Sequence, residues 1–291
     1  MRKETVLAQP AKILTGEQRE RYFEDGFLLL PEFVSATWLN RLQTVTNAML
    51  DESKNVTKSN EKFVLERGHS AVTPRLRRLT SPVEHDVAYW EFAANSEITD
   101  IAEDLLGPSV KFHHSKLNFK ADSGGMALQW HQDFPFMPHT NSCVLTIGIY
   151  LADVDETTAP MALVPGSHQR ELFSMYNDKD QWVGAIQSKD LPRSGIERAV
   201  PLVGKAGSVT VHHARTVHGS PDNNSPNPRP LLLYMFSAGD AMPVSTNTIP
   251  SRYHGQLVRG RRPQWIELEP GPIVLPPEAS ARPGGIFAAQ Q

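Results

Sequence analysis

The sequence predicts a mainly β protein with flanking helices, built on a jelly-roll core, that is, a double-stranded β-helix of about eight strands. Between Val110 and Phe236, short β-like runs alternate with turns rich in Gly, Pro and Asn, which is the pattern of such a core. Patterns of helical spacing come before residue 110. With 291 residues, 40% hydrophobic and 21% charged, the chain has the length and composition of one globular domain.

The first elements follow from local signals. Residues 1–13 are mixed and polar, and we expect a loose arm. Thr15 and Gln18 have the spacing of a capping box, which predicts a helix that starts here and ends near Gly26. Phe27–Leu30 is a short apolar run, typical of a buried strand.

Further helices are expected in the rest of the N-terminal region, residues 14–109. Apolar residues recur at helical spacing from Ser35 to about Leu50. A polar loop over 51–62 follows, and the basic segment Arg67 to Arg78 is expected to be a solvated loop, with a loop that folds over the mouth of the pocket as the alternative. Tyr89 to Leu106 reads as one helix, which Gly107 and Pro108 end.

We therefore expect a single domain over residues 1–291. Its parts are the arm, the helical region, a jelly-roll core over 110–240 and a C-terminal extension over 241–291. Residues 270–291 are expected to be poorly ordered, because Pro, Gly and Ala dominate them.

Composition excludes several classes of function. A net charge of −3 gives no electrostatic reason to expect nucleic acid. The single cysteine, Cys143, fits a reducing compartment. Met1 to Pro10 does not resemble a signal peptide, and no apolar run reaches the ~20 residues of a membrane span. We expect a cytoplasmic enzyme for a small-molecule substrate, without nucleic acid or membrane partners; the oligomeric state is open.

The most informative motif is the pair His131 and Asp133. Side chains at i and i+2 of a strand point to the same face, so an imidazole and a carboxylate would meet at one point. A second histidine from a distant strand would complete three ligands on one face of a metal. Mononuclear non-haem Fe(II) oxygenases use this arrangement.

Three histidines compete for the third position, and a nearby arginine bears on the choice. His212 and His213 lie within a β-rich run and face opposite sides, whereas His218 lies past its end. A polar loop then leads to the apolar run Pro230–Phe236, so the unit reads as two antiparallel strands joined by a loop. Arg229, at the start of the second strand, could bind a carboxylate in a bidentate manner.

Together these residues resemble the phytanoyl-CoA dioxygenase family of Fe(II)/2-oxoglutarate-dependent oxygenases, in its bacterial branch. The resemblance runs from about Leu14 to Ala241 and rests on motifs in family order. They are Thr15–Pro31, Lys120 with Ser123-Gly124-Gly125, Trp130-His131-Gln132-Asp133, Leu163–His168, and His218-Gly219-Ser220 with Arg229.

The resemblance implies the cofactors and the site. Fe(2+) would be bound by His131, Asp133 and His218, which are also the catalytic set, and O2 and 2-oxoglutarate would be co-substrates. Arg229 would take the far carboxylate of 2-oxoglutarate, with Ser220, Gln129, Asn118 and Lys120 as further candidates. Candidates for substrate contact are Phe134, Phe136, Met137, His139 and Arg215.

The resemblance further implies oxidation of a substrate C–H bond, most simply hydroxylation, with release of succinate and CO2. Small phosphonates or similar anions are the substrate class that it points to. Two other readings stay open. One is a metal-dependent cupin-type enzyme that does not use 2-oxoglutarate, and the other is a catalytically silent binding protein on the same scaffold. A carboxylate clamp at Arg229 and Gln129 would argue against the cupin-type enzyme, and the intact ligand set argues against the silent protein.

Overall fold

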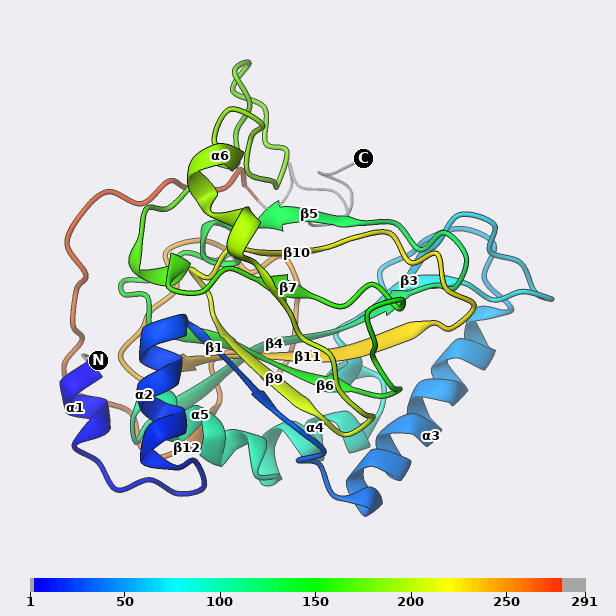
Figure 1. The fold of residues 1–291 in the computed structure, drawn as a ribbon. Helices are drawn as coiled ribbons and strands as arrows, with labels where there is room; N and C mark the ends of the chain where they lie inside the picture. Colours follow the sequence, from blue (N-terminus) through cyan, green and yellow to red (C-terminus); the bar gives the residue numbers. More distant parts are fainter. Residues whose placement is uncertain (1–2, 279–291) are drawn as a thin grey trace.

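A computed structural model describes residues 3–278, and in this part of the chain two β-sheets face each other. Figure 1 shows the smaller sheet above the larger one. The larger sheet has the order β1 (Phe27–Leu30), β9 (Val209–His213), β6 (Val144–Tyr150), β11 (Arg229–Ala238), β4 (Val110–Lys120), β3 (Leu76–Thr80) and β2 (Phe63–Leu65), and β12 (Leu257–Arg259) pairs with β4. The smaller sheet has the order β5 (Leu128–His131), β10 (His218–Ser220), β7 (Ala162–Leu163) and β8 (Val200–Pro201). The strands pair antiparallel throughout, which confirms the predicted fold class.

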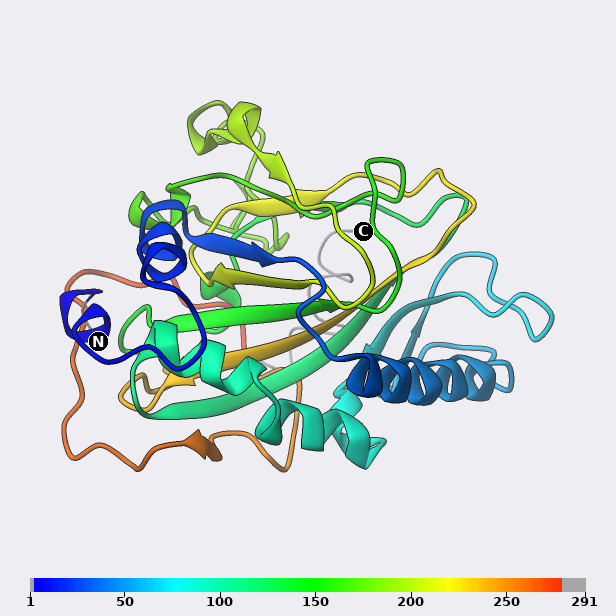
Figure 2. The ribbon, with the colours of Figure 1, turned by 60° about the horizontal axis from the view of Figure 1, so that its bottom comes forward.

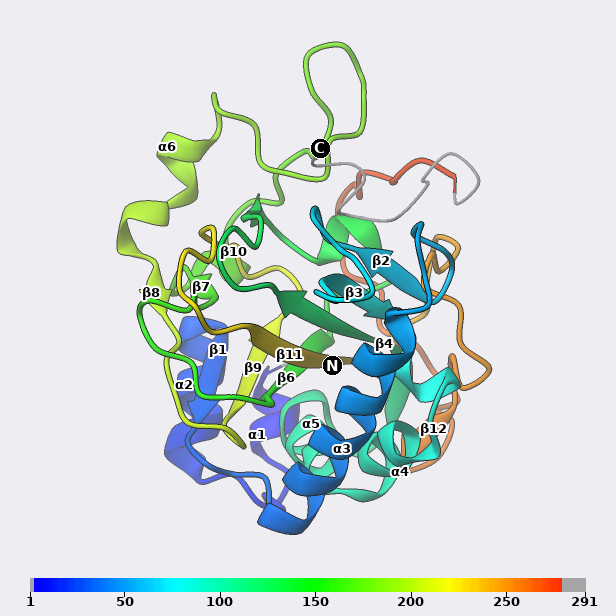
Figure 3. The ribbon, with the colours of Figure 1, turned by 90° about the vertical axis from the view of Figure 1, so that its right-hand side faces the viewer.

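Helices cover the outer face of the larger sheet (Figures 1 and 2). The α-helices are α1 (Lys3–Leu7), α2 (Gly16–Asp25), α3 (Ala36–Ser53), α4 (Val87–Asn95), α5 (Ile98–Leu106) and α6 (Leu191–Ser194), and the 3-10 turns are η1 (Pro82–Glu84), η2 (Phe134–Phe136), η3 (Ser167–Gln169) and η4 (Ile196–Arg198). The view in Figure 3 shows α3, α4 and α5 on the side away from β7 and β10. Among residues 3–278, no helix combines the length and the apolar character that a membrane crossing needs.

Strand alternation divides the larger sheet into a core face and a cavity face. On β11, Leu232, Tyr234 and Phe236 belong to the main hydrophobic cluster, which also contains residues of α3, α4 and α5. Leu231 and Leu233 point the other way and line a cavity between the sheets. Because side chains alternate along a strand, burying one face against helices directs the other face into the jelly roll.

Several expectations about elements are confirmed. Thr15 and Gln18 form the predicted capping box, and Gly26 ends α2 with a left-handed backbone at φ 86°. Glycine suits this position because it has no Cβ to clash there. The predicted strand Phe27–Leu30 and the helix from Ser35 are also present, with Ser35 as the N-cap of α3.

Other expectations about elements were wrong. The segment Tyr89–Leu106 is not one helix, since Ser96 is extended and separates α4 from α5; an Asn-Ser pair favours a helix end over a helix interior. The end of the basic segment is not solvated, because Arg77 and Arg78 are buried in β3. The strands β9 and β11 do not pair with each other, because β6 lies between them.

The two ends of the chain also differ from expectation. Residues 257–259 of the C-terminal extension form β12, and residues 270–278 have no helix or strand. The rest of the segment expected to be poorly ordered, 279–291, lies outside the described residues. The N-terminal arm is held rather than loose, with Val6 buried in α1. Arg19 donates to the carbonyls of Val6 and Gln9 and, through Nε, to that of Asp104 at 3.0 Å.

The buried carboxylate of Asp104 is the second anchor of the arm. It accepts hydrogen bonds from the backbone N–H groups of Lys12, Ile13 and Leu14 at 2.6, 2.9 and 2.8 Å. Asp104→Ala should lower the free energy of unfolding by about 3 kcal/mol, because it leaves these donors without their charged acceptor. Urea unfolding measures this, with the exposed Asp178→Ala as control. Equal stability of the two variants would show that the arm is not anchored here.

Candidate metal centre

Two histidines and one aspartate converge between the sheets. One ligand atom of each of His131, Asp133 and His218 lies within 4.8 Å of the others, and all three residues are buried. His131 and His218 are direct cross-strand partners on β5 and β10, and their ring centroids are 4.1 Å apart. Asp133 comes after the end of β5, immediately before η2. The structure therefore brings together the three predicted ligands, although Asp133 reaches the site from a turn and not from the strand.

Backbone carbonyls orient both imidazoles. Nδ1 of His131 lies 2.8 Å from the carbonyl oxygen of Gln129, and Nδ1 of His218 lies 2.9 Å from that of Thr216. A carbonyl only accepts, so each Nδ1 carries the proton and each Nε2 keeps its lone pair. Nε2 of His131 lies 3.8 Å from Oδ1 of Asp133. Such hydrogen bonds fix ring orientation in metal-binding histidines.

Two neighbours hold the Asp133 carboxylate through one of its oxygens. Thr146 Oγ1 donates to Oδ2 at 3.0 Å, and His212 Nε2 lies 3.2 Å from the same oxygen. Oδ1 is left facing the histidines, with Lys116 Nζ at 3.9 Å. Burial by itself would raise the pKa of Asp133, but Lys116, His212 and His218 together hold it well below its usual value.

The ligand set has the charge that a divalent metal needs. Burial lowers the pKa of His131 to about 4, and burial lowers that of His218 well below its usual value. Both imidazoles are therefore neutral near pH 7, and Asp133 is ionised. Two neutral nitrogen donors and one carboxylate on one side of a site are the donors of a non-haem Fe(II) centre.

The far end of the same cavity contains an arginine and a serine. Arg229 and Ser220 line it together with the three ligands. Among residues 3–278, Nε and Nη1 of Arg229 and Oγ of Ser220 are buried without a hydrogen-bond partner. Buried polar groups are normally paired, so these donors fit an anion, and a guanidinium fits a carboxylate in particular.

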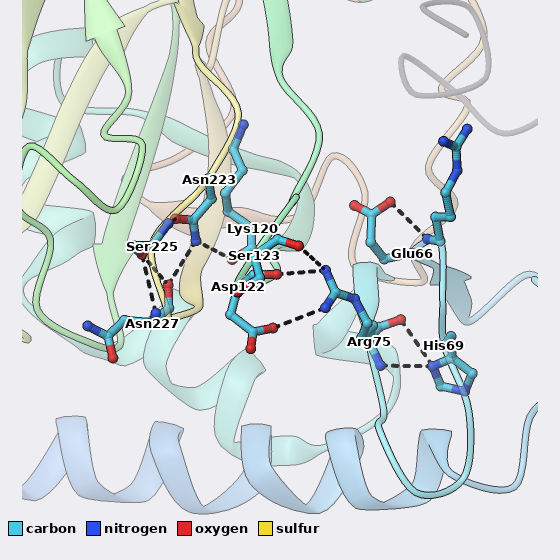
Figure 4. A network of polar contacts seen from close by, with 10 residues as sticks. Glu66, His69, Arg75, Lys120, Asp122, Ser123, Asn223, Ser225 and Asn227 are labelled. Carbon is cyan, nitrogen blue, oxygen red and sulfur yellow. Dashed lines mark hydrogen bonds and ion pairs between the residues drawn. The ribbon is translucent and has the colours of Figure 1, made fainter.

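A polar network, part of which is drawn in Figure 4, holds the loops at the end of β4, where Lys120 pairs with Arg229. The ammonium of Lys120 donates to the carbonyls of Met126 and Pro221 at 2.8 and 2.6 Å. Asn223 donates to the carbonyls of Lys120 and Asn227 at 3.3 and 2.8 Å. Burial lowers the pKa of Lys120 to about 7. Lys120 is not one of the described cavity-lining residues, and it instead connects the loops that contain Met126 and Pro221.

Gln129 and Asn118, the other predicted co-substrate residues, differ in their placement. Asn118 lines the cavity and accepts from Nε of Arg78 at 3.1 Å. Gln129 is exposed and does not line it. The pairing of β5 with β10 shifts register between His131 and Leu128. This irregularity puts Leu128, three residues before His131, on the ligand's face, which strict alternation would give to Gln129.

The predicted substrate residues do not form one group. Phe136 packs near the metal centre, 5.9 Å from the ring of His131 and 5.2 Å from that of Trp182. Phe134 and Met137 belong to a separate hydrophobic cluster. His139 and Arg215 line a different pocket beside Glu269, and Arg215 forms an ion pair with this residue at 2.8 Å. The structure therefore places His139 and Arg215 away from the cavity of the ligands.

Sequence reasoning missed four polar residues that line the cavity: Arg78, Lys116, Thr146 and His212. Lys116 could have been found, because residues 116, 118 and 120 are polar and alternate with Leu117 and Phe119 on β4. His212 had been considered only as a rival for the third ligand. No local pattern indicated Arg78, which reaches the site through the pairing of β3 with β4 opposite Asn118.

Comparison with known proteins agrees with this geometry. The model of the family described as Phytanoyl-CoA dioxygenase (PhyH) matches residues 22–231. The chain belongs to the phytanoyl-CoA dioxygenase family. It is an Fe(II)- and 2-oxoglutarate-dependent dioxygenase, as the resemblance in its motifs predicted. A "probable alpha-ketoglutarate-dependent hypophosphite dioxygenase" of Stutzerimonas stutzeri is 32% identical over 286 residues, which cover 95% of this chain and 97% of that protein.

More distant relatives share the fold. An ectoine dioxygenase of Bordetella bronchiseptica is 28% identical, with 78% of this chain and 77% of that protein covered. The crystal structure of EctD from S. alaskensis with bound Fe has a TM-score of 0.70 at 22% identity and covers 92% of this chain and 93% of that one. The same protein with 2-oxoglutarate and 5-hydroxyectoine gives a TM-score of 0.67 at 20% identity, with 94% and 93% covered.

The buried histidines make stability depend on pH. Burial lowers the pKa of both His131 and His139 from 6.5 to about 4. Between these values the unfolded chain binds protons that the folded chain does not, so stability falls as pH falls through this window, by about 3 kcal/mol for each histidine. Urea unfolding of the metal-free protein across the window should show this loss. In His139→Asn, whose amide can still donate to the Met137 carbonyl, the loss should be about 3 kcal/mol smaller; an unchanged loss would contradict the assignment.

Proposed function

We propose that this dioxygenase hydroxylates a small anionic substrate, and that His131, Asp133 and His218 bind its iron. The observation that carries the proposal is the shared cavity. The three ligand atoms and the buried, unpartnered donors of Arg229 and Ser220 line the same space. The larger sheet contains both β1, from the N-terminal region, and β12, from the C-terminal extension, which supports a single domain over the chain.

Each residue then has a definite task. Arg229 binds the far carboxylate of 2-oxoglutarate through its planar fork, and Ser220 donates a further hydrogen bond. Thr146 and His212 keep one oxygen of Asp133 occupied, so that the other faces the metal. When bound, iron and 2-oxoglutarate supply the oxidising power, with release of succinate and CO2, while the protein orients the reactants and excludes water.

Two rival functions are less well supported. A cupin-type enzyme without 2-oxoglutarate has no use for a buried arginine and serine beside the metal site. A silent binding protein has no use for a complete set of neutral imidazoles and an ionised carboxylate, each held by hydrogen bonds. Burying such groups is costly, and the function as an oxygenase explains all of them.

The positive charge of the cavity supports an anionic substrate. Arg78, Lys116 and Arg229 line it, and Asp133 is the one carboxylate among its described lining residues. A small phosphonate fits this charge, and so does hypophosphite, the compound in the name of a relative that covers almost the whole chain. Hydroxylation of a phosphonate would convert a C–H bond into C–OH. The equivalent reaction of hypophosphite would convert a P–H bond into P–OH.

His131→Ala and Asp133→Ala should each abolish iron-dependent formation of succinate from 2-oxoglutarate, because each removes a third of the ligand set. Succinate release under air measures this after anaerobic loading with Fe(II), and bound iron is measured in parallel. Asp178→Asn, an exposed change, is the control. Full activity of His131→Ala would refute the proposed metal site.

Arg229→Ala should raise KM for 2-oxoglutarate by roughly a hundredfold, in line with the loss of a bidentate charged pair. The value of kcat at saturating 2-oxoglutarate should change much less, because the iron ligands are untouched. Arg229→Lys, which keeps the charge and loses the fork, should lie between the two. A KM that stays at the wild-type value would show that Arg229 is not the clamp.

A further inference from the structure

A second group of cations lies at the metal end of the cavity, apart from Arg229. Lys116 Nζ is 3.9 Å from Oδ1 of Asp133, and its side chain is 13% exposed. Arg78 is buried in the neighbouring strand, opposite Asn118, to which it donates. Lys116 of β4 pairs with Leu233 of β11, four residues from Arg229, which separates these two levels by about 13 Å along the strand. Arg78 lies between them, because its partner Asn118 pairs with Leu231.

The charges of the cavity do not balance without a further anion. In the proposed complex the two charges of Fe(II) and the one of Arg229 are offset by Asp133 and the two carboxylates of 2-oxoglutarate. Lys116 then remains as a positive charge on the wall beside Asp133. Asp133 is the one carboxylate among the described lining residues, and the metal shares its charge. Buried charges are stable only when something compensates them.

We propose that Lys116, supported by Arg78, is the substrate's anion site and that the substrate is a compact oxyanion oxidised at or next to the atom that carries its charge. This rests on the proposed function and deepens it. Lys116 is within 4 Å of Oδ1 of Asp133, the oxygen nearest His131, so an oxyanion bound to it would lie next to the residues that would hold the metal. Hydrogens one or two bonds from the charged group would then be the ones nearest to those residues.

The short distance between Lys116 and Asp133 selects the bond that is oxidised. For hypophosphite this is a P–H bond, which becomes P–OH: H2PO2⁻, O2 and 2-oxoglutarate give H2PO3⁻, succinate and CO2. One oxygen atom of O2 enters the phosphite and the other enters the succinate. For an alkylphosphonate, the bond is the C–H next to phosphorus, and the product is the 1-hydroxyalkylphosphonate. Leu128, Leu231 and Leu233 form the apolar walls of the cavity.

Two other roles for Lys116 are separable from this one. It could serve only to keep Asp133 ionised, but His212 and Thr146 already bind that carboxylate, and a bound metal would do so as well. It could instead bind the carboxylate of 2-oxoglutarate nearer the iron. In the first case, loss of the Lys116 ammonium weakens metal binding. In the second case, its loss weakens the binding of 2-oxoglutarate. Neither alternative predicts an effect that is confined to binding of the oxyanion.

The test measures binding without turnover. Isothermal titration calorimetry follows hypophosphite and methylphosphonate added to the protein loaded with Mn(II) and 2-oxoglutarate, with O2 excluded. Lys116→Met, which keeps the length of the side chain, should weaken the oxyanion Kd about tenfold or more, and Arg78→Met should do the same to a smaller extent. Lys205→Met, an exposed lysine paired with Asp153, is the matched control and should bind like the wild type.

The Kd values for Mn(II) and 2-oxoglutarate decide between the roles. The proposal expects both to stay within about twofold of wild type in Lys116→Met. Unchanged oxyanion binding in Lys116→Met, a parallel loss of Mn(II) or 2-oxoglutarate binding, or no binding of either oxyanion to the wild type would each overturn it. Succinate release by the wild type without oxyanion tests the proposed function separately, so failure of the anion site leaves that result intact.

Discussion

The pairing of β5 with β10 is the constraint on which the site depends. It sets His131 directly across from His218, although 87 residues separate them in the chain, as their numbers show. Both strands are short and lie in the smaller sheet, which faces the larger one. The larger sheet packs against α3, α4 and α5 through the main hydrophobic core. It also provides Thr146 and His212, which contact the carboxylate of Asp133.

The same alternation that builds the core also builds the chemistry. On β4 and β11, one side of each strand is buried among helices, and the other presents Lys116, Asn118 and Arg229 to the cavity. Strand alternation thus gives two independent sets of residues from one segment. Changes on the cavity face would alter specificity without loosening the core, which explains how one scaffold accommodates relatives named for substrates as different as hypophosphite, ectoine and proline.

Local and ordered signals predicted much of the fold and of the metal centre, while long-range register decided the rest. The capping box at Thr15, the strand Phe27–Leu30 and the ligand motif were readable because each is encoded within a few residues. Gln129 was misplaced because a shift of register at β5 breaks the alternation on which the prediction relied. Arg78 could not be assigned, because its place depends on β3 pairing with a strand some forty residues further on, which no local pattern reports.

The charges of the cavity also couple the ligands to one another. Lys116 helps to hold Asp133 ionised, which favours a metal ion, but its positive charge also repels that ion, so the two effects oppose each other while no anion is bound. An oxyanion on Lys116 removes that repulsion. Coupling between two binding sites is reciprocal, so an anion that favours the metal is itself favoured by it. In the proposed complex, iron, 2-oxoglutarate and the substrate anion each compensate a charge in the cavity. Binding of one should therefore strengthen the binding of the others.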